Sequence, residues 1–193
     1  MNTIIDVMLH VVRVLDELGV EYVLVGSVAS SARGFPRSTN DADIVADLRL
    51  EHADRLVASL RDGFYIDPDA VARAIVRHRS FNAIHHASGF KVDVFVPPPD
   101  GFGRQQLARR SQEHLDPAGP QAIFVATAED VVISKLDWYR ASDGTSDRQW
   151  HDLVGVIKVQ APTIDLAYLR QWAVRLGLTE LLDRALAEAR ESV

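Results

Sequence analysis

The segment Pro97-Pro98-Pro99-Asp100-Gly101 divides the 193-residue chain into two parts of different character. Proline and glycine interrupt helices and strands, so such a run marks a boundary between elements. Before it, short apolar stretches alternate with amphipathic helical patterns, whereas only helical patterns follow Thr127. The sequence therefore predicts an α+β protein with a core over residues 1–97. A linker with a short helix and strand spans 98–126, and a C-terminal helical region spans 127–193.

Hydrophobic periodicity locates the elements on either side of this boundary. Helices are expected over residues 4–18, 28–33 and 68–76, with a further amphipathic helix that carries Ala53, Leu56, Val57 and Leu60 and ends at Gly63. Strands are expected over residues 22–25, 41–48, 64–66, 81–86 and 90–96. A helix over 103–110 and a strand over 121–125 are expected in the linker. Three or four helices follow Thr127.

Composition argues against several classes of protein. The net charge of −6 disfavours a large nucleic-acid surface, because such a surface needs clustered positive charge. The chain has no cysteine, so it forms neither disulfides nor thiolate metal sites. No apolar run approaches the ~20 residues of a membrane-spanning helix, and the first residues lack the basic leader of a signal peptide. We therefore expect a cytoplasmic protein with no membrane partner.

Gly26 and Ser27 lie between an expected strand and an expected helix. Glycine lets the backbone approach a ligand closely, and the start of a helix offers free N–H groups to a phosphate. Such turns are also common in proteins that bind no phosphate. The chain has no Walker A motif, so a P-loop is not expected.

Asp41 and Asp43 lie two residues apart on an expected strand. Their side chains would share one face, with Cα atoms ~6.6 Å apart, so both carboxylates could reach one metal site. Magnesium prefers hard oxygen ligands and leaves positions open for substrate phosphates. The alternative is a solvated strand end.

Asp93 lies in the apolar stretch Lys91-Val92-Asp93-Val94-Phe95-Val96. An unpaired buried carboxylate is unfavourable, so Asp93 is expected either at a solvated edge or at a ligand. Lys91 would share its face, which also fits a half-buried strand with one solvent face.

Together, these pieces resemble the signature of the DNA-polymerase-β-like nucleotidyltransferase superfamily. That signature is an apolar strand, Gly-Gly or Gly-Ser, a spacer of roughly nine to thirteen residues, and then an Asp, a hydrophobic residue and an Asp or Glu. The stretch VGSVASSARGFPRSTNDADIV also resembles the minimal and abortive-infection-toxin-type branches. Ala42 departs from the bulky aliphatic residue that is usual there, and the step from Gly26 to Asp41 is long.

The resemblance implies a mixed sheet flanked by helices and a metal-dependent transfer of a nucleoside monophosphate from a nucleoside triphosphate. Asp41, Asp43 and Asp93 would be the catalytic and metal-binding residues of a two-ion Mg²⁺ site, which Mn²⁺ could also occupy. Asp41 and Asp43 would hold the nucleotide-bound ion, while Asp93 would serve the second ion and the acceptor hydroxyl. Ser27 would hold the terminal phosphates.

Each of the other polar candidates fits two different roles. Lys135 falls on the apolar side of its expected helix, so it contacts a phosphate or extends to the surface. Arg37 precedes Asp41 by four residues and fits either a phosphate contact or a surface ion pair. With Gly26 and Ser27, these two residues form the expected nucleotide-binding set. Arg148 and Asp152 have the i,i+4 spacing of a helix-surface pair, although acidic residues in this region belong to the site in some toxin-like relatives.

The expected function is nucleotidyl transfer, and a toxin-like role with an antitoxin partner is one form that it could take. The acceptor is open: a tRNA end, a protein hydroxyl and a small alcohol such as an antibiotic all fit. One alternative is a catalytically silent module of the same fold that binds nucleotide or RNA. Another is a hydrolase that uses two metal ions to direct water, although the sequence lacks the ligand set rich in His and Asp that such enzymes commonly carry.

Overall fold

The computed structural model describes residues 3–114 and 122–191, and by packing it divides into two compact units. The first unit comprises Met1–Val25 and Ser38–Val125, and the second comprises Gly26–Arg37 and Ala126–Val193. The second unit therefore includes a segment from the N-terminal half of the chain. This division differs from the expected boundaries at 97 and 126, because the segment 26–37 packs with the C-terminal helices.

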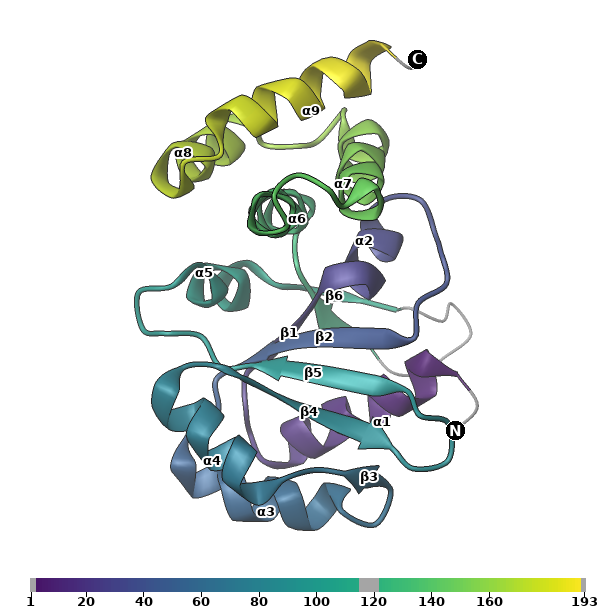
Figure 1. Ribbon diagram of the computed structural model, residues 1–193, viewed down its shortest axis with the longest axis vertical. Coiled ribbons are helices and arrows are strands. Elements are labelled where there is room, and N and C mark those ends of the chain that lie inside the picture. The colour runs from purple at the N-terminus through teal and green to yellow at the C-terminus, as the bar shows by residue number, and fades with distance from the viewer. Residues whose placement is uncertain (1–2, 115–121, 192–193) are drawn as a thin grey trace. The chain divides into compact units, whose positions relative to one another are not determined.

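The first unit is built on a mixed sheet (Figure 1). Among the described residues its strands are β1 (Tyr22–Val25), β2 (Asp41–Ala46), β3 (Phe64–Tyr65), β4 (Ser80–His85), β5 (Lys91–Phe95), β6 (Ser111–Glu113) and β7 (Ile123–Val125). They lie in the order β3-β4-β5-β2-β1-β7-β6. β2 is parallel to β5 and β1 is parallel to β7, while the other neighbours are antiparallel. The predicted α+β class and mixed sheet are confirmed.

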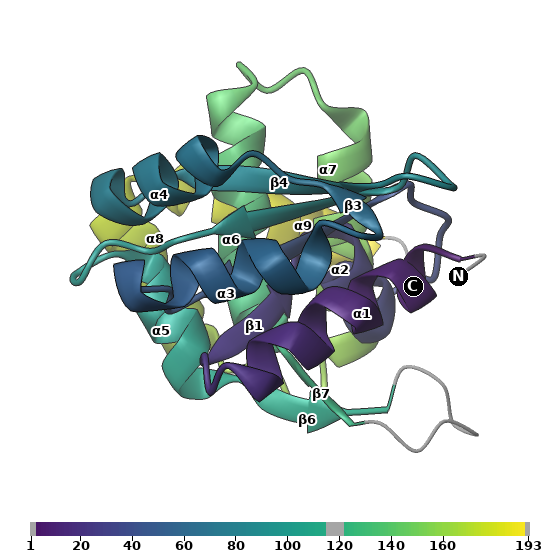
Figure 2. The ribbon, with the colours of Figure 1, turned by 90° about the horizontal axis from the view of Figure 1, so that it is seen from below.

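The helices of the first unit are α1 (Ile4–Glu17), α3 (Leu50–Leu60), α4 (Pro68–Arg77) and α5 (Phe102–Arg109). α1 contacts β2 and β5, and Figure 2 shows α1, α3 and α4 side by side. The buried stripe of α1 is Val7, Met8, Val11, Val12, Val14 and Leu15. Ala42 and Ile44 of β2 and Val92 of β5 are fully buried, so the even-numbered positions of these strands face the core on the side of α1.

α5 lies against the opposite face of β2. A side chain at Gly103 would meet Val45, since an added Cβ would lie 3.3 Å from Val45 Cγ1. The next helical residue, Arg104, donates from Nη1 to Asp47 Oδ1 at 2.7 Å. The odd-numbered face of β2 therefore ends under α5, and its other end carries Asp41 and Asp43.

The second unit is helical in the residues that the structure describes. Its helices are α2 (Gly26–Arg33), α6 (Ala128–Ala141), α7 (Asp147–Gln160), α8 (Leu166–Leu176) and α9 (Thr179–Glu191). α6 and α7 pack together, α2 contacts both, and α9 contacts α7 and α8. The largest fully buried side chains of this unit are Ile133, Leu136 and Leu153. None of the described helices is long and apolar enough to cross a membrane.

Several boundaries differ from those expected. α2 begins at Gly26 instead of Val28, and β2 ends at Ala46, where Asp47 N–H turns to the carbonyl of Glu21. β6 was not expected, because its polar sequence Ser-Gln-Glu shows no apolar alternation. The strand expected over 121–125 is observed as Ile123–Val125, and Gln121 lies outside the described residues.

Candidate active site

Asp41, Asp43 and Asp93 lie on one face of the sheet. In the parallel pairing of β2 with β5, Asp43 is the Cα partner of Asp93, and Asp41 is the partner of Lys91. Partners on neighbouring strands point to the same face, and residues two apart on one strand do so as well. The structure thus places the three predicted carboxylates, together with Lys91, on the face opposite the α1 core.

Two hydrogen bonds restrain these carboxylates. Thr39 Oγ1 donates to Asp41 Oδ1 at 2.5 Å, and Lys91 Nζ lies 2.7 Å from Asp93 Oδ2. The Asp93 side chain is 19% exposed and that of Lys91 is 41% exposed, so the pair is open to water. The hydrogen bond to Asp93 raises the pKa of Lys91 against the opposing effect of burial, and the charges of Asp93, Asp41 and Asp43 raise it further.

The three carboxylates offer the ligand type that a hard divalent cation prefers, and the strand register puts them on one face. Carboxylate oxygens are the ligands that magnesium prefers, and three carboxylates share this face. Their attraction for a cation is visible in the ammonium of Lys91 on Asp93. As the side chains lie, no three His, Cys, Asp or Glu residues within the described ranges form a metal-binding group.

The turn at Gly26 belongs to the second unit and needs glycine. Gly26 has φ +62°, a left-handed conformation that other residues rarely adopt. Ser27 follows it in the first turn of α2 and is 9% exposed. Its Oγ accepts a hydrogen bond from Arg37 Nη2 at 2.6 Å. Two of the expected nucleotide-binding residues, Ser27 and Arg37, are therefore in direct contact.

Asp152 of α7 joins the remaining candidates to this contact. Arg37 Nε and Nη2 both donate to its carboxylate at 2.9 Å, and Lys135 Nζ donates to Oδ2 at 2.8 Å. Lys135 also donates to Gln149 Oε1 at 2.7 Å. We call Ser27, Arg37, Lys135, Gln149 and Asp152 the Asp152 cluster. Its two cations and one anion carry a net positive charge beside the N-terminus of α2, an arrangement that favours an anion.

Two interpretations of the sequence change here. The expected surface pair of Arg148 and Asp152 is wrong, because Asp152 is 8% exposed and points to Arg37 and Lys135 while Arg148 is exposed. Lys135 does not extend to the surface either, since its side chain is 3% exposed. Burial opposes ionisation of Asp152, but the hydrogen bonds from Arg37 and Lys135 outweigh it and lower the pKa of its carboxyl group.

Two glycines let the loop before Arg37 approach α7. A Cβ at Gly34 would lie 2.9 Å from the backbone nitrogen of Val156. A Cβ at Gly155 would lie 2.9 Å from Cδ2 of Phe35. Gly155 is one helical turn from Asp152, so the close approach at Gly155 helps to bring Arg37 to the carboxylate. A glycine inside an amphipathic helical pattern is the signal that could have indicated this contact.

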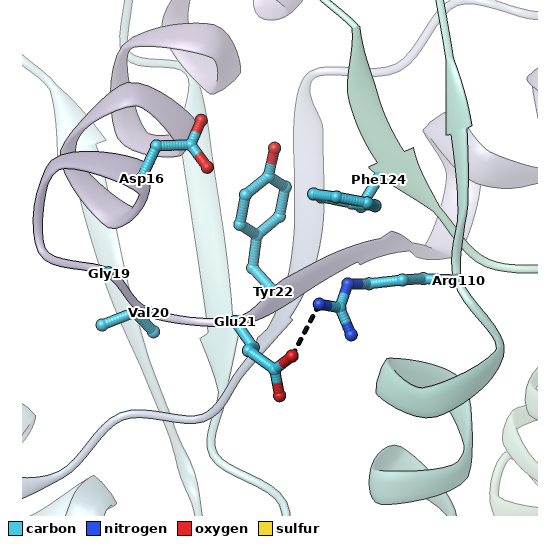
Figure 3. Close-up of a pocket in the computed structure, with 7 residues that line it drawn as sticks. All are labelled: Asp16, Gly19, Val20, Glu21, Tyr22, Arg110 and Phe124. Atoms are coloured by element: carbon cyan, nitrogen blue, oxygen red, sulfur yellow. Dashed lines mark hydrogen bonds and ion pairs between the residues drawn. The ribbon is translucent and has the colours of Figure 1, made fainter.

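A separate cavity of about 140 Å³ opens in the first unit at the start of β1 (Figure 3). It is lined by Asp16, Gly19, Val20, Glu21, Tyr22, Arg110 and Phe124. Arg110 Nη2 donates to Glu21 Oε1 at 2.7 Å, and its Cζ lies 4.7 Å from the centre of the Phe124 ring. Burial, and to a lesser extent the charge of Asp16, raises the pKa of Tyr22 to about 12. Because Tyr22 pairs with Ala46 while Val25 pairs with Asp43, the cavity lies at the other end of β1 from the carboxylates.

Comparison with known proteins relates this fold to one class. No protein-family model and no curated protein matches the sequence. An antigenic nucleotidyltransferase-like protein from Paracoccidioides brasiliensis is 15% identical, with a TM-score of 0.53 over 93% of this chain and 91% of its own. The lincosamide antibiotic adenylyltransferase LnuA, solved with lincomycin bound, is 14% identical, with a TM-score of 0.51 over 82% of this chain and 99% of its own. The chain therefore has a nucleotidyltransferase-like fold, as the resemblance predicted.

Proposed function

We propose that this chain is a metal-dependent nucleotidyltransferase that moves a nucleoside monophosphate from a nucleoside triphosphate to an acceptor hydroxyl. The observation that supports this most is the register of β2 with β5, which puts Asp41, Asp43 and Asp93 on one face of a nucleotidyltransferase-like sheet. A module that only binds nucleotide has no need of the third carboxylate.

In this reaction the acceptor oxygen attacks the α-phosphorus. The bond from that phosphorus to the oxygen that bridges the α- and β-phosphates breaks, and pyrophosphate leaves. Asp41 and Asp43 would hold the magnesium ion that accompanies the triphosphate. Asp93 would complete a second ion site and take the proton from the acceptor hydroxyl. Bound magnesium would supply charge neutralisation at the phosphates and at the attacking and leaving oxygens.

The Asp152 cluster supports phosphate binding by Gly26, Ser27, Arg37 and Lys135. Three of these residues converge within the second unit, where Asp152 holds both cations in fixed positions. The cluster is net positive, and the first turn of α2 presents backbone N–H groups next to it. Asp152 acts here as a positioning residue, since it orients Arg37 and Lys135 and would repel a phosphate itself.

The acceptor must be a compound with a nucleophilic hydroxyl group. A tRNA end, a protein hydroxyl and a small alcohol are the candidates, and a toxin-like role with an antitoxin partner rests on the sequence resemblance alone. LnuA, which has a related fold, is an antibiotic adenylyltransferase, so small alcohols of that kind are the first acceptors to test.

Labelled triphosphates test the proposed reaction. The purified chain is incubated with magnesium, a cell extract and each triphosphate in turn, labelled at either the α- or the γ-phosphorus. Nucleotidyl transfer labels an acceptor from the α-labelled compound only, and Asp41→Asn should abolish the labelling. Label arriving from the γ-phosphorus would indicate phosphoryl transfer, and release of free monophosphate without a labelled acceptor would indicate a hydrolase. Triphosphate binding with no product would identify the silent module.

A further inference from the structure

Lys91 is a cation inside a cluster of anions. It is the Cα partner of Asp41 and lies two residues before Asp93, so all three side chains leave the same face of the sheet. Its Nζ lies 2.7 Å from Asp93 Oδ2. Across the sheet, β4 presents the uncharged residues Ile84 and Asn82 opposite Lys91 and Asp93. Lys91 therefore brings a positive charge to this part of the face, and its β4 neighbours bring none.

The position of this ammonium group conflicts with a metal ion on the same carboxylate. A divalent cation at Asp93 would meet the like charge of Lys91 at close range, where the two positive charges repel each other. Lys91 can leave without a change in the backbone, because its side chain is 41% exposed and has a flexible four-carbon stem.

We propose that Lys91 is the resting counter-cation of the carboxylate cluster and competes with the metal ion for Asp93. Without metal, Lys91 offsets the mutual repulsion of Asp41, Asp43 and Asp93. When metal binds, the ammonium group moves from Asp93 into water. This inference rests on the proposed function, because it takes these three carboxylates as the metal ligands.

The affinity of the whole chain for Mn²⁺, measured without nucleotide by calorimetry or by the electron paramagnetic resonance of free Mn²⁺, tests the competition. Lys91→Met removes the charge and keeps a similar length, whereas Lys91→Arg keeps the charge. Lys158→Met, on α7, is the matched control for net charge. We expect Lys91→Met to lower the Mn²⁺ dissociation constant roughly tenfold, with the control unchanged. Lys91→Arg should stay close to the parent protein.

Two further measurements separate the possible outcomes. In chelator, Lys91→Met should melt below Lys158→Met, because the three carboxylates then repel one another, and Mn²⁺ should remove the difference. In the background of Asp93→Asn, Lys91→Met should bring a much smaller gain in affinity, because the direct competition for Asp93 is already absent. Unchanged or weaker Mn²⁺ binding by Lys91→Met would overturn the competition. Failure of the parent and all variants to bind Mn²⁺, or binding that Asp41→Asn and Asp43→Asn leave intact, would instead overturn the proposed metal site.

Discussion

Asp43 of β2 and Asp93 of β5 are direct partners on neighbouring parallel strands, so their carboxyl groups leave the sheet side by side. Two carboxylates in this position repel each other unless a cation lies near them. Lys91 supplies one such cation at Asp93. The proposed function assigns the two acids to different ions, and that assignment separates binding of the nucleotide from transfer.

Asp93→Asn should retain most of the affinity for triphosphate, because Asp41 and Asp43 still hold the nucleotide's metal ion. Transfer should fall by ~10²–10⁴, since the second ion and the proton acceptor are lost together. Asp41→Asn should weaken binding and transfer alike, and the exposed Asp100→Asn should change neither. Steady-state kinetics with an identified acceptor and direct nucleotide titration give both quantities. A transfer rate at the parent level in Asp93→Asn would show that Asp93 has no role in transfer and merely lies on a solvated strand.

Asp152→Asn should destabilise the protein by about 3–5 kcal/mol, because it leaves the cations of Arg37 and Lys135 without their buried anion. Asp147→Asn, exposed on the same helix, is the control and should change the free energy of unfolding little. The pair Lys135→Met with Asp152→Leu should recover part of the loss, since both buried charges then disappear. Urea unfolding measures all three. If Asp152→Asn lowers the free energy of unfolding by less than about 1 kcal/mol, the ion pairs of Asp152 contribute no more than ordinary surface ion pairs do.

The acid stability of the protein should depend on Asp152. The pKa of its carboxyl group is lower in the folded protein, so folding favours the ionised form. Its contribution to stability is therefore complete above the unfolded pKa of ~3.9 and is lost as the pH falls through the lower folded value. The difference in unfolding free energy between parent and Asp152→Asn should be constant from neutral pH to about 5 and shrink below about 4. A difference that stays constant to the lowest pH would contradict the assignment.

Gly155→Ala should disturb the loop that carries Arg37. The new methyl group would lie 2.9 Å from Phe35, whose side chain is 54% exposed and free to move outward. We expect a small change in stability and a severalfold weaker affinity for triphosphate. Phe35→Ala in the same chain should restore the affinity by making room. Gly63→Ala is a matched control, because nothing lies within 4 Å of a Cβ there. Equal triphosphate affinities in Gly155→Ala and Gly63→Ala would show that this contact does not position Arg37.

The sequence predicts the direction of a side chain correctly where that direction depends only on neighbouring residues of the same strand. Alternation of apolar and acidic residues predicted that Asp41 and Asp43 share a face, and Lys91 and Asp93 followed the same rule on their own strand. Pairing of the two strands is a long-range event that no periodicity reports. The register that sets Asp43 against Asp93, and Lys91 against Asp41, came only from the structure.

The Asp152 cluster shows where local patterns mislead. Arg148 and Asp152 have helix-surface spacing, but Asp152 is buried by a loop 115 residues earlier in the chain. That docking depends on the small size of Gly34 and Gly155, and a hydrophobic pattern registers neither. For the same reason the sequence assigned residues 26–37 to the first part of the chain, although they pack with α6 and α7.

The central claim is that Asp41, Asp43 and Asp93 bind the metal ion of a nucleotidyl transfer. A crystal structure of the protein with Mn²⁺ and a triphosphate that resists cleavage at the α-phosphorus tests it most directly, because the anomalous signal locates manganese without ambiguity. We expect a manganese peak within coordination distance of oxygens of Asp41 and Asp43, with Asp93 turned from Lys91 toward the metal site. Bound triphosphate with manganese elsewhere, or with Lys91 still on Asp93 and no peak at the three carboxylates, would contradict it.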